Sequence, residues 1–460
     1  MVLSLSSVTI IETCHTPEEE VTVKICRKVL RKWSLKSNTI IQFKIGSCSK
    51  EVLVQSADLS PGEIQIPKKL FETFALPELD GRYLAKYTPN NNTIHVGPII
   101  GLLTDFEINE NKEPNFRSIH AFCEELHHGI KETGGFFFVF SLEGFSETGI
   151  KGYYHKDGKW VLGSFPLPDV IYNRIHSRKL EYHKIFLSFY KCINSLKIPF
   201  FNDRFLSKWE VYNLLVQEDF MHPYLPETKI FSGENLVNML SQHDTVFVKP
   251  VHGSQGRRIL KISKEDKIFN IQSSLTSMTD KFIKKESQEA VYEHLKQMIN
   301  NKIYIVQKGI SLTSYHSRTM DFRVLCHKNF QELWEVTSLV ARISSEKQFV
   351  SNIARGGEIM KPLAALSPIF SRDTAREIIS LMKELSIEIA GILSSKTAGL
   401  TGELGVDIGV DMAGNLWLIE VNSKPSKNFE EPEKKIRPSA RSIIKYCTKL
   451  AFEALSEKEE

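Results

Sequence analysis

The spacing of hydrophobic positions changes along the chain, and the first change marks an expected domain boundary. Within residues 1–95, short runs such as VTVKIC, TIIQFKI and GEIQI alternate apolar with polar residues, and turn-forming residues separate them. A period of two is typical of strands with one buried face. Because no long helical period occurs here, we expect a small β-rich N-terminal domain.

Longer apolar runs begin at residue 96 and alternate with segments of helical period. The runs PIIGLL and FFFVF have the composition of buried strands, and residues 117–133 between them carry apolar side chains at helical spacing. Strands that alternate with helices predict an α/β domain with a partly parallel sheet, here over residues 96–200.

Residues 201–455 continue this alternation and form the third expected domain. Thr374 and Glu377 are spaced as a capping box at the start of the longest expected helix. The chain is therefore interpreted as an α/β protein. The main elements expected in the third domain are helices 208–217, 287–300 and 374–394 and strands 245–249 and 303–307.

Composition places the chain among ordinary soluble globular proteins, with 42% hydrophobic and 25% charged residues. The formal net charge of +4 is spread along the chain, so we expect neither nucleic acid nor an anionic membrane as a partner. No apolar run approaches the ~18 residues that span a bilayer. The seven dispersed cysteines predict no disulfide framework or zinc site. The N-terminus makes a poor signal peptide, so we expect the protein in the cytoplasm where it is synthesised.

Two strand-like runs near the C-terminus, GVDIGVD and LWLIEVN, are joined by a turn-rich connection and predict a β-hairpin. If Met412–Asn415 form a four-residue loop, Asp411 pairs with Leu416 and Asp407 lies opposite Glu420. Two like charges that face each other destabilise a bare hairpin, and a bound cation would reverse that effect.

Asp407, Glu420 and Asn422 therefore form a candidate magnesium site. Regular alternation puts Leu418, Glu420 and Asn422 on one side of the second strand. Two carboxylates and an amide oxygen are hard ligands, which suit Mg²⁺ that bridges substrate phosphates better than they suit zinc. The alternative is a hairpin that carries polar residues on a solvated face.

The segment FVKPVHGSQGRRILKI is interpreted as two strands around a glycine-rich loop. Lys249 ends the first strand, and the loop contains Gly253, Ser254 and Gly256. Backbone amides of such a loop can contact phosphate oxygens while a strand lysine supplies a positive charge. The Walker A pattern is absent, and an ordinary glycine-rich hairpin loop is the alternative.

Three further segments carry polar residues beside apolar strands. The run YIVQKGISL places Gln307 and Lys308 at a strand end, where backbone groups can read an adenine edge; an ordinary strand end is the alternative. Arg323 and Arg342 lie in strands with apolar neighbours, and a buried arginine requires an anionic partner. The polar loop SNIARGG, which contains Asn352, follows.

Together and in this order, the segments resemble the ATP-grasp superfamily over roughly residues 200–450, and they look most like its YheC/YheD group of endospore coat-associated proteins. The resemblance implies an ATP-grasp fold that is preceded by a Rossmann-like pre-ATP-grasp domain and a β-rich N-terminal domain. The segments that carry it are FNDRFLSKWEVYNLL, VKPVHGSQG, YIVQKGI, DFRV, SNIARGG and GVDIGVD…WLIEVNSKPS, with GPIIGLLT and DVIYNRI in the middle domain.

The resemblance also implies ATP and Mg²⁺ as cofactors and a nucleotide clamped between two α+β lobes. Many ATP-grasp ligases carry an acidic ribose-binding residue soon after the adenine strand, and this chain offers none before Asp321. The implied roles are phosphate contact for Lys208 and Lys249, adenine contact for Gln307, Lys308 and Ile310, metal binding for Asp407, Glu420 and Asn422, and contact with the phosphate and acyl phosphate for Arg323, Arg342 and Asn352.

The resulting hypothesis is an ATP- and Mg²⁺-dependent ligase of carboxylate–amine type. A substrate carboxylate attacks the γ-phosphate to form an acyl phosphate, which an amine or thiol then opens. The expected partners are the nucleotide and these unidentified substrates. The alternative is a non-catalytic spore-coat structural or assembly protein that retains nucleotide binding, and the resemblance adds the spore coat as a location and its proteins as partners.

The middle domain is expected to contribute to acceptor binding. Tyr172, Asn173 and Arg174 follow a buried-type strand, and the ends of such strands commonly meet ligands in α/β sheets. The alternative is a polar strand end at the protein surface.

Overall fold

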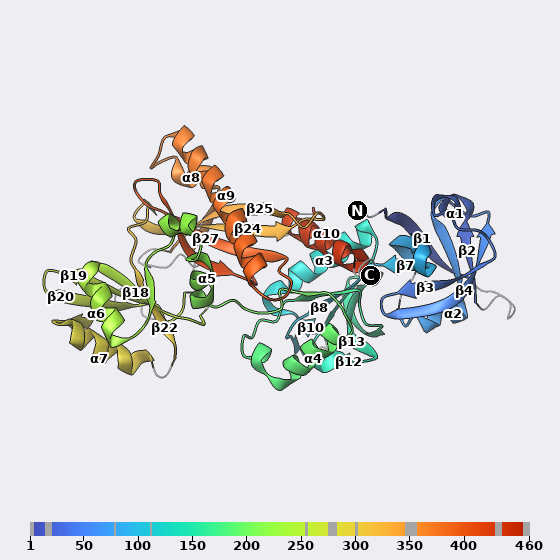
Figure 1. Cartoon of the computed structure of the whole chain (residues 1–460), viewed down its shortest axis with the longest axis horizontal. Coiled ribbons are helices and arrows are strands. Elements are labelled where there is room, and N and C mark those ends of the chain that lie inside the picture. Colours follow the sequence, from blue (N-terminus) through green and yellow to red (C-terminus); the bar gives the residue numbers. More distant parts are fainter. Residues whose placement is uncertain are drawn as a thin grey trace.

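The computed structural model describes most of the chain, and its sheets follow one another along a single long axis (Figure 1). A closed barrel forms one end of this axis, and the sheet of β17–β22 forms the other. In the described residues no helix is long and apolar enough to cross a membrane. The described ranges are 4–13, 21–77, 80–110, 113–253, 256–274, 283–299, 302–345, 357–427 and 435–453.

The N-terminal barrel has the strand order β1-β5-β2-β4-β3-β7-β6, which confirms the β-rich expectation. Its strands bury alternate side chains, as the period of two predicts, and two short helices lie between them. The elements are β1 (Ser6–Thr13), β2 (Thr22–Cys26), α1 (Arg27–Lys32), β3 (Thr39–Ile45), β4 (Cys48–Ala57), β5 (Glu63–Pro67), α2 (Lys68–Thr73), β6 (Gly81–Thr88) and β7 (Thr93–Gly97).

The middle sheet contains the predicted parallel strands. β8 lies between β11 and β15 and is parallel to both, and β16 extends the parallel part beyond β15. The elements are β8 (Ile99–Leu103), β9 (Glu107–Ile108), β10 (Pro114–Asn115), α3 (His120–Thr133), β11 (Phe136–Phe140), β12 (Phe145–Ser146), β13 (Gly149–Lys156), β14 (Lys159–Phe165), β15 (Val170–Asn173), α4 (Lys184–Ser195) and β16 (Phe200–Phe201).

An antiparallel sheet with the order β17-β22-β18-β19-β20-β21 follows, and its apolar face packs against two helices. β18 and β22 are antiparallel neighbours in this sheet, and Phe247 pairs with Gln307. The elements are α5 (Lys208–Leu215), which precedes this sheet, β17 (Thr228–Ile230), α6 (Gly233–Gln242), β18 (Thr245–Pro250), β19 (Leu260–Glu265), β20 (Ile268–Ser273), β21 (Ile283–Lys285), α7 (Gln288–Ile299) and β22 (Tyr304–Lys308).

The last sheet has the order β26-β25-β24-β27-β28 and packs against the long helix α9. That helix begins earlier than predicted, because Ser371 and not Thr374 is its N-cap, and the Ser371 hydroxyl accepts from the Thr374 N–H. The elements are β23 (Ser314–Tyr315), β24 (Arg318–Lys328), β25 (Trp334–Ile343), β26 (Glu358–Met360), α8 (Pro362–Leu366), α9 (Arg372–Lys396), β27 (Glu403–Val410), β28 (Leu416–Asn422) and α10 (Pro438–Glu453).

The C-terminal helix α10 returns to the middle sheet and packs against α3 (Figure 1). Tyr446 of α10 contacts Phe201 of β16, with ring centroids 5.2 Å apart. The two helices approach closely at Gly129, where a Cβ would lie 2.5 Å from Ile444 Cδ1. The last helix therefore fixes the middle sheet relative to the C-terminal sheets. The expected division at residues 95 and 200 stays a prediction about folding units.

Candidate active site

The predicted hairpin is formed by β27 and β28, and Asp407 lies opposite Glu420 as predicted. The route to this pairing differs from the expected one. Val410, not Asp411, pairs with Leu416, so residues 411–415 connect the strands, one more than expected. Within this connection the Asp411 N–H donates to the carbonyl of Asn415 at 3.0 Å, and Gly414 has a φ of +87°. A register shift of one residue between Asp407 and its neighbour then restores the facing pair.

The register shift also corrects the expected faces of β28. Ile419 is the extra residue of this β-bulge, since Ile408 pairs with Leu418 and the next pair is Asp407 with Glu420. Leu418 and Val421 are both buried in the core that faces α9, although regular alternation would put them on opposite sides. The sequence predicted Leu418 and Glu420 on the same face of β28. In the structure they lie on opposite faces.

The carboxylate of Asp407 is engaged by two arginines of the same sheet. Arg323 lies directly across from it on β24 and binds both carboxylate oxygens, with a distance of 2.8 Å from Nη2 to Oδ2. Arg342 of β25 reaches the same Oδ2 at 3.0 Å and also binds Asp321 at 2.6 and 2.7 Å. Burial opposes ionisation of Asp407, but the two guanidinium groups outweigh it and lower its pKa. The predicted anionic partners of these buried arginines are therefore side chains of the protein itself.

Glu420 is paired with Lys208, the first residue of α5. The distance from Nζ to Oε1 is 2.7 Å, and both side chains are mostly buried. Helix α5 begins here because Ser207 and Glu210 form a capping box. The repulsion between Asp407 and Glu420 is thus offset by protein cations, so the facing pair by itself does not require a metal ion.

Lys249 lies in β18, across a cleft from Lys208 and Glu420. Its ammonium donates to Gln307 Oε1 at 2.6 Å, and Gln307 Nε2 donates to Thr228 Oγ1 at 2.9 Å. The pKa of Lys249 is lowered to about 8, mainly by burial and also by the charge of Lys208, while Glu420 acts in the opposite direction. Lys249 is therefore a half-buried cation without a carboxylate in hydrogen-bond contact among the residues described.

A narrow cleft separates the two walls, with a cavity volume of about 30 Å³ in this structure. It lies between β18 and β22 on one side and α5 and β28 on the other, so both candidate phosphate-binding lysines border the same space. The lining residues are Lys208, Val211, Tyr212, Leu225, Pro226, Thr228, Lys249, Ile305, Gln307, Leu418, Ile419, Glu420 and Val421.

The other residues predicted to contact the nucleotide are Lys308, Ile310, the glycine-rich loop and Asn352, and the structure describes only some of them. The Lys308 N–H donates to the carbonyl of Glu227 at 2.8 Å, so an adenine contact by Lys308 would have to come from its carbonyl or side chain. The Ile310 carbonyl accepts from Leu312 at 3.1 Å. Gly253 begins the loop after β18, and Gly256 has a φ of +63°. Ser254 and Asn352 lie outside the described residues.

The donor chemistry fits Mg²⁺ in part. Glu420 borders the cleft, and the side-chain nitrogen of Asn422 lies 3.5 Å from Asp407 Oδ2, which directs the amide oxygen away from Asp407. Hard oxygen ligands suit Mg²⁺, but Asp407 would have to share its oxygens with Arg323 and Arg342. Within the described ranges no three His, Cys, Asp or Glu side chains form a metal site, so the candidate set depends on Asn422 as its third member.

Tyr172, Asn173 and Arg174 are buried rather than at the surface, so the surface alternative is wrong. Arg174 binds Glu403 at the start of β27 at 2.5 Å, and the Tyr172 hydroxyl donates to the same carboxylate. Lys427 also binds Glu403, whose pKa is lowered well below its usual value by these cations despite burial, which opposes the shift. These contacts hold the middle sheet against the hairpin.

Arg178 and His252 also lie at this site, and the sequence analysis did not single them out. Arg178 Nη1 lies 3.4 Å from His252 Nδ1. His252 directly precedes Gly253, and this position beside the glycine-rich loop was the available signal. Nothing local in the sequence marks Arg178, because it reaches the loop from the middle domain.

Comparison with known proteins gives one family match and two curated relatives. A family described as "YheC/D like ATP-grasp" matches residues 197–450. The endospore coat-associated protein YheD of Bacillus subtilis (strain 168) is 26% identical over 406 residues, which cover 86% of this chain and 87% of the relative. The endospore coat-associated protein YheC of the same organism is 24% identical over 285 residues, with coverages of 60% and 75%.

Solved structures with similar folds include two ligases. The D-alanine-D-alanine ligase from Coxiella burnetii has a TM-score of 0.45 and 10% identity, and the match covers 78% of this chain and 97% of that one. The ATP-grasp ligase PsnB, complexed with minimal precursor, Mg and ADP, has a TM-score of 0.43 and 12% identity, with coverages of 76% and 97%.

Proposed function

Because the chain belongs to the YheC/D-like ATP-grasp family, as the match over residues 197–450 shows, we propose that it is an ATP- and Mg²⁺-dependent ligase that joins a carboxylate to an amine or thiol. The family match confirms the predicted ATP-grasp fold and the resemblance to the YheC/YheD group. The substrates, the residues that bind them and the chemistry are parts of the proposal.

The observation that carries the proposal is the position of Lys208 and Lys249 on opposite walls of one cleft, which Glu420 also lines. Lys249 is half-buried and has a neutral partner, Gln307, so it carries a charge that this partner does not neutralise. A buried cation is costly without an anion. The polyphosphate of a nucleotide would supply that anion.

The site residues would have two roles, contact with the phosphates and binding of the metal ion. Lys208 and Lys249 would neutralise charge on the phosphates during transfer, and Glu420, Asn422 and Asp407 would hold Mg²⁺. When bound, the metal ion neutralises and orients phosphate oxygens. Phosphoryl transfer depends mainly on positioning and charge, so no nucleophilic side chain is needed. The substrate carboxylate attacks the γ-phosphorus and ADP leaves, which gives an acyl phosphate. The amine or thiol then attacks the acyl carbon and loses its proton, and inorganic phosphate leaves.

Ligand binding would require an exchange of charged partners. Lys208 and Glu420 bind each other in this structure, at 2.7 Å. A phosphate would compete with Glu420 for Lys208, and a cation would compete with Lys208 for Glu420. Nucleotide and metal ion together supply a new partner for each member of the pair, whereas either one alone leaves one member unpaired. We therefore propose that the two bind cooperatively.

Titration calorimetry with Mg²⁺–ADP and with Mg²⁺–ATP tests the proposal, using wild type and Lys249→Ala. The substitution should weaken binding by about 1.5–3 kcal/mol, the scale of a hydrogen bond to a charged group. Lys229→Ala is the matched control, because Lys229 lies on β17 of the same sheet and pairs with Glu227 at 2.9 Å. Unchanged affinity of Lys249→Ala would contradict the assignment.

The names of both curated relatives favour a second candidate function, a role in the endospore coat. A structural or assembly protein of the coat would retain nucleotide binding without turnover. Phosphate release from ATP, measured while candidate carboxylates and amines are added in pairs, distinguishes the two functions. Substrate-dependent release supports the ligase, and binding without release under all pairs supports the assembly protein.

A further inference from the structure

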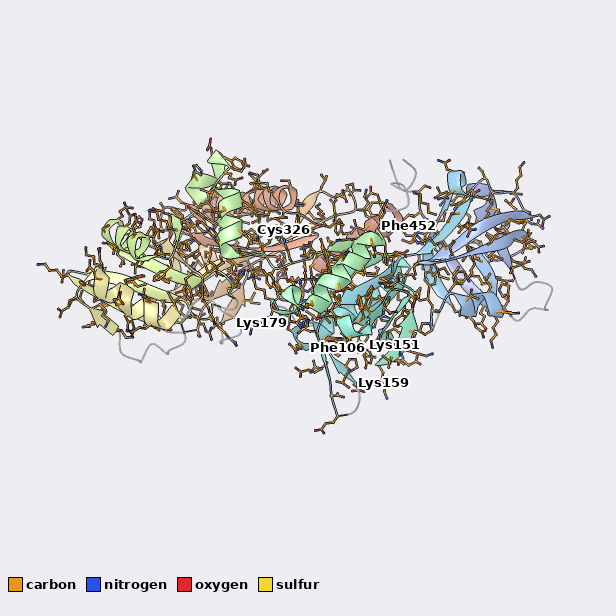
Figure 2. All side chains as sticks on the ribbon, turned by 60° about the horizontal axis from the view of Figure 1, so that its bottom comes forward. Phe106, Lys151, Lys159, Lys179, Cys326 and Phe452 are labelled. Atoms are coloured by element: carbon orange, nitrogen blue, oxygen red, sulfur yellow. The ribbon has the colours of Figure 1, made fainter. Side chains whose placement is uncertain are left out.

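Arg178 extends from the segment after β15 to the phosphate side of the cleft. Its Nη1 donates to the carbonyl of Leu206 at 3.0 Å and lies 3.4 Å from His252 Nδ1. Leu206 directly precedes the N-cap of α5, and His252 directly precedes the glycine-rich loop. Figure 2 labels the neighbouring residue Lys179 at the junction between the middle sheet and the C-terminal sheets. Arg178 therefore lies where the two segments that border the phosphate side meet.

The guanidinium group of Arg178 is partly buried and makes no ion pair with a carboxylate in the described part of the chain. Arg323 and Arg342, by contrast, are both paired with carboxylates. Arg178 stacks on Phe205, with Cζ 4.7 Å from the ring centroid. Burial lowers the pKa of Arg178, and the charge of Glu420 is the strongest of those that oppose this effect. The group thus carries a desolvation cost that no protein carboxylate offsets directly.

His252 is a second hydrogen-bond partner of Arg178. Burial lowers the pKa of His252, and the adjacent charges of Arg178 and Lys208 lower it further, so the ring is neutral and its Nδ1 can accept a hydrogen bond. Both hydrogen bonds of Arg178 within the described residues use Nη1. Its Nε and Nη2 are therefore the nitrogens available to a ligand.

Contacts link the cleft to Arg178. Gln307, at the strand that would meet adenine, binds Lys249 at 2.6 Å, and Lys208 lines the same cleft. The Lys208 ammonium lies 3.5 Å from the carbonyl of Gly253. Arg178 contacts Leu206, two residues before Lys208, and His252, one residue before Gly253. The guanidinium group therefore borders the Lys208 end of the cleft, toward which a bound nucleotide would extend its phosphates.

We propose that Arg178 binds the terminal phosphoryl group of ATP through Nε and Nη2. This inference rests on the proposed nucleotide site and extends it with a residue from the segment before the ATP-grasp match, which begins at residue 197. With Arg178 the phosphate side has three cations, the other two being Lys208 and Lys249, and of these Lys208 is paired with Glu420. A cluster of cations is complementary to a polyphosphate. The middle domain would then sense whether the nucleotide carries its γ-phosphate.

The test compares Mg²⁺–ADP with Mg²⁺ and the non-hydrolysable analogue AMP-PNP by calorimetry, in wild type, Arg178→Gln and Arg178→Lys. Arg178→Gln should weaken AMP-PNP binding about tenfold or more and leave ADP binding unchanged, because only the analogue has the third phosphoryl group. The affinity of Arg178→Lys for AMP-PNP should lie between those of wild type and Arg178→Gln. Arg204→Gln is the matched control, since Arg204 is a nearby cation that is 42% exposed and pairs with Glu210; it should change neither affinity.

Melting temperatures without ligand show whether each variant is folded, and Arg178→Lys keeps the test usable if Arg178→Gln does not fold. Equal weakening of ADP and AMP-PNP, or no change in either, would overturn the role of Arg178. A folded wild-type protein that binds neither nucleotide would instead overturn the proposed function.

Discussion

Lys208 and Glu420 form an ion pair of 2.7 Å that joins the first residue of α5 to the second strand of the hairpin. Beyond Glu420, the row continues across the sheet through Asp407 to Arg323, so two carboxylates lie between two cations. Protein side chains therefore neutralise the candidate metal ligands in this structure. The pair couples the metal side of the site to its phosphate side.

Glu420→Gln should lower the free energy of unfolding by about 0.5–1 kcal/mol, because the ion pair with Lys208 is lost. Relief of repulsion with Asp407 does not stabilise the variant, since Asp407 is already paired with two arginines. The rise in melting temperature caused by Mg²⁺–ADP should be smaller than in wild type. Thermal melting of both proteins, with and without Mg²⁺–ADP, measures both effects. Equal ligand-induced shifts would refute a metal role for Glu420.

Asp407→Asn should be far more destabilising than Glu420→Gln. Asp407 is buried, and removing its charge weakens its contacts with Arg323 and Arg342. Breaking a buried charge pair costs about 3–5 kcal/mol. Urea denaturation of the variant measures the loss, with Asp373→Asn as a control because that side chain is 88% exposed. A loss below about 1 kcal/mol, the scale of a surface pair, would mean that these contacts contribute little to stability.

Nucleotide binding should take up a proton at mildly alkaline pH. The pKa of Lys249 is about 8 without ligand, against an ordinary value of 10.5. A bound phosphate would favour the charged form and raise this pKa. Calorimetry at pH 8 in buffers of different ionisation enthalpy should therefore show net proton uptake in wild type. Lys249→Arg stays protonated in this range and should show no uptake; equal uptake in both would assign the proton to another group.

The titration of Lys249 also makes the free energy of unfolding depend on pH. Its pKa is lowered in the folded state, so between pH 8 and 10.5 the unfolded chain binds more protons than the folded one. Stability from this group therefore rises as pH increases through that window. Lys249→Met removes the titration without restoring a charge, and its unfolding free energy should rise less with pH than that of wild type. Parallel pH profiles in urea denaturation would contradict this assignment.

Glu403→Gln should destabilise the contact between the middle sheet and β27. Its carboxylate is fully buried and binds Arg174 and Lys427, which lie far apart in the sequence. The variant would leave two buried cations without their carboxylate, at a cost of about 3–5 kcal/mol. Urea denaturation measures this cost. Glu335→Gln is the control, because Glu335 accepts from Ser442 and is only partly buried; similar losses in both variants would argue against a special role for Glu403.

Local patterns in the sequence were sufficient for the elements and for the family. A period of two predicted the barrel strands, and buried apolar runs predicted the parallel strands β8, β11 and β15. Helical spacing predicted α9, with a start two residues later than the observed one. The facing of Asp407 and Glu420 was also predictable, because pairing in a hairpin depends on residues that are close in the chain.

Only the tertiary structure decided which charges those residues meet. The bulge at Ile419 sends Leu418 into the core, and alternation alone cannot predict where a strand gains a residue. Lys208 meets Glu420 across 212 residues of sequence. Arg178 reaches His252 across 74 residues. Side-chain periodicity reports which face of an element is buried, but it carries no information on the distance between elements, and ion pairs form only where packing brings opposite charges within a few ångströms.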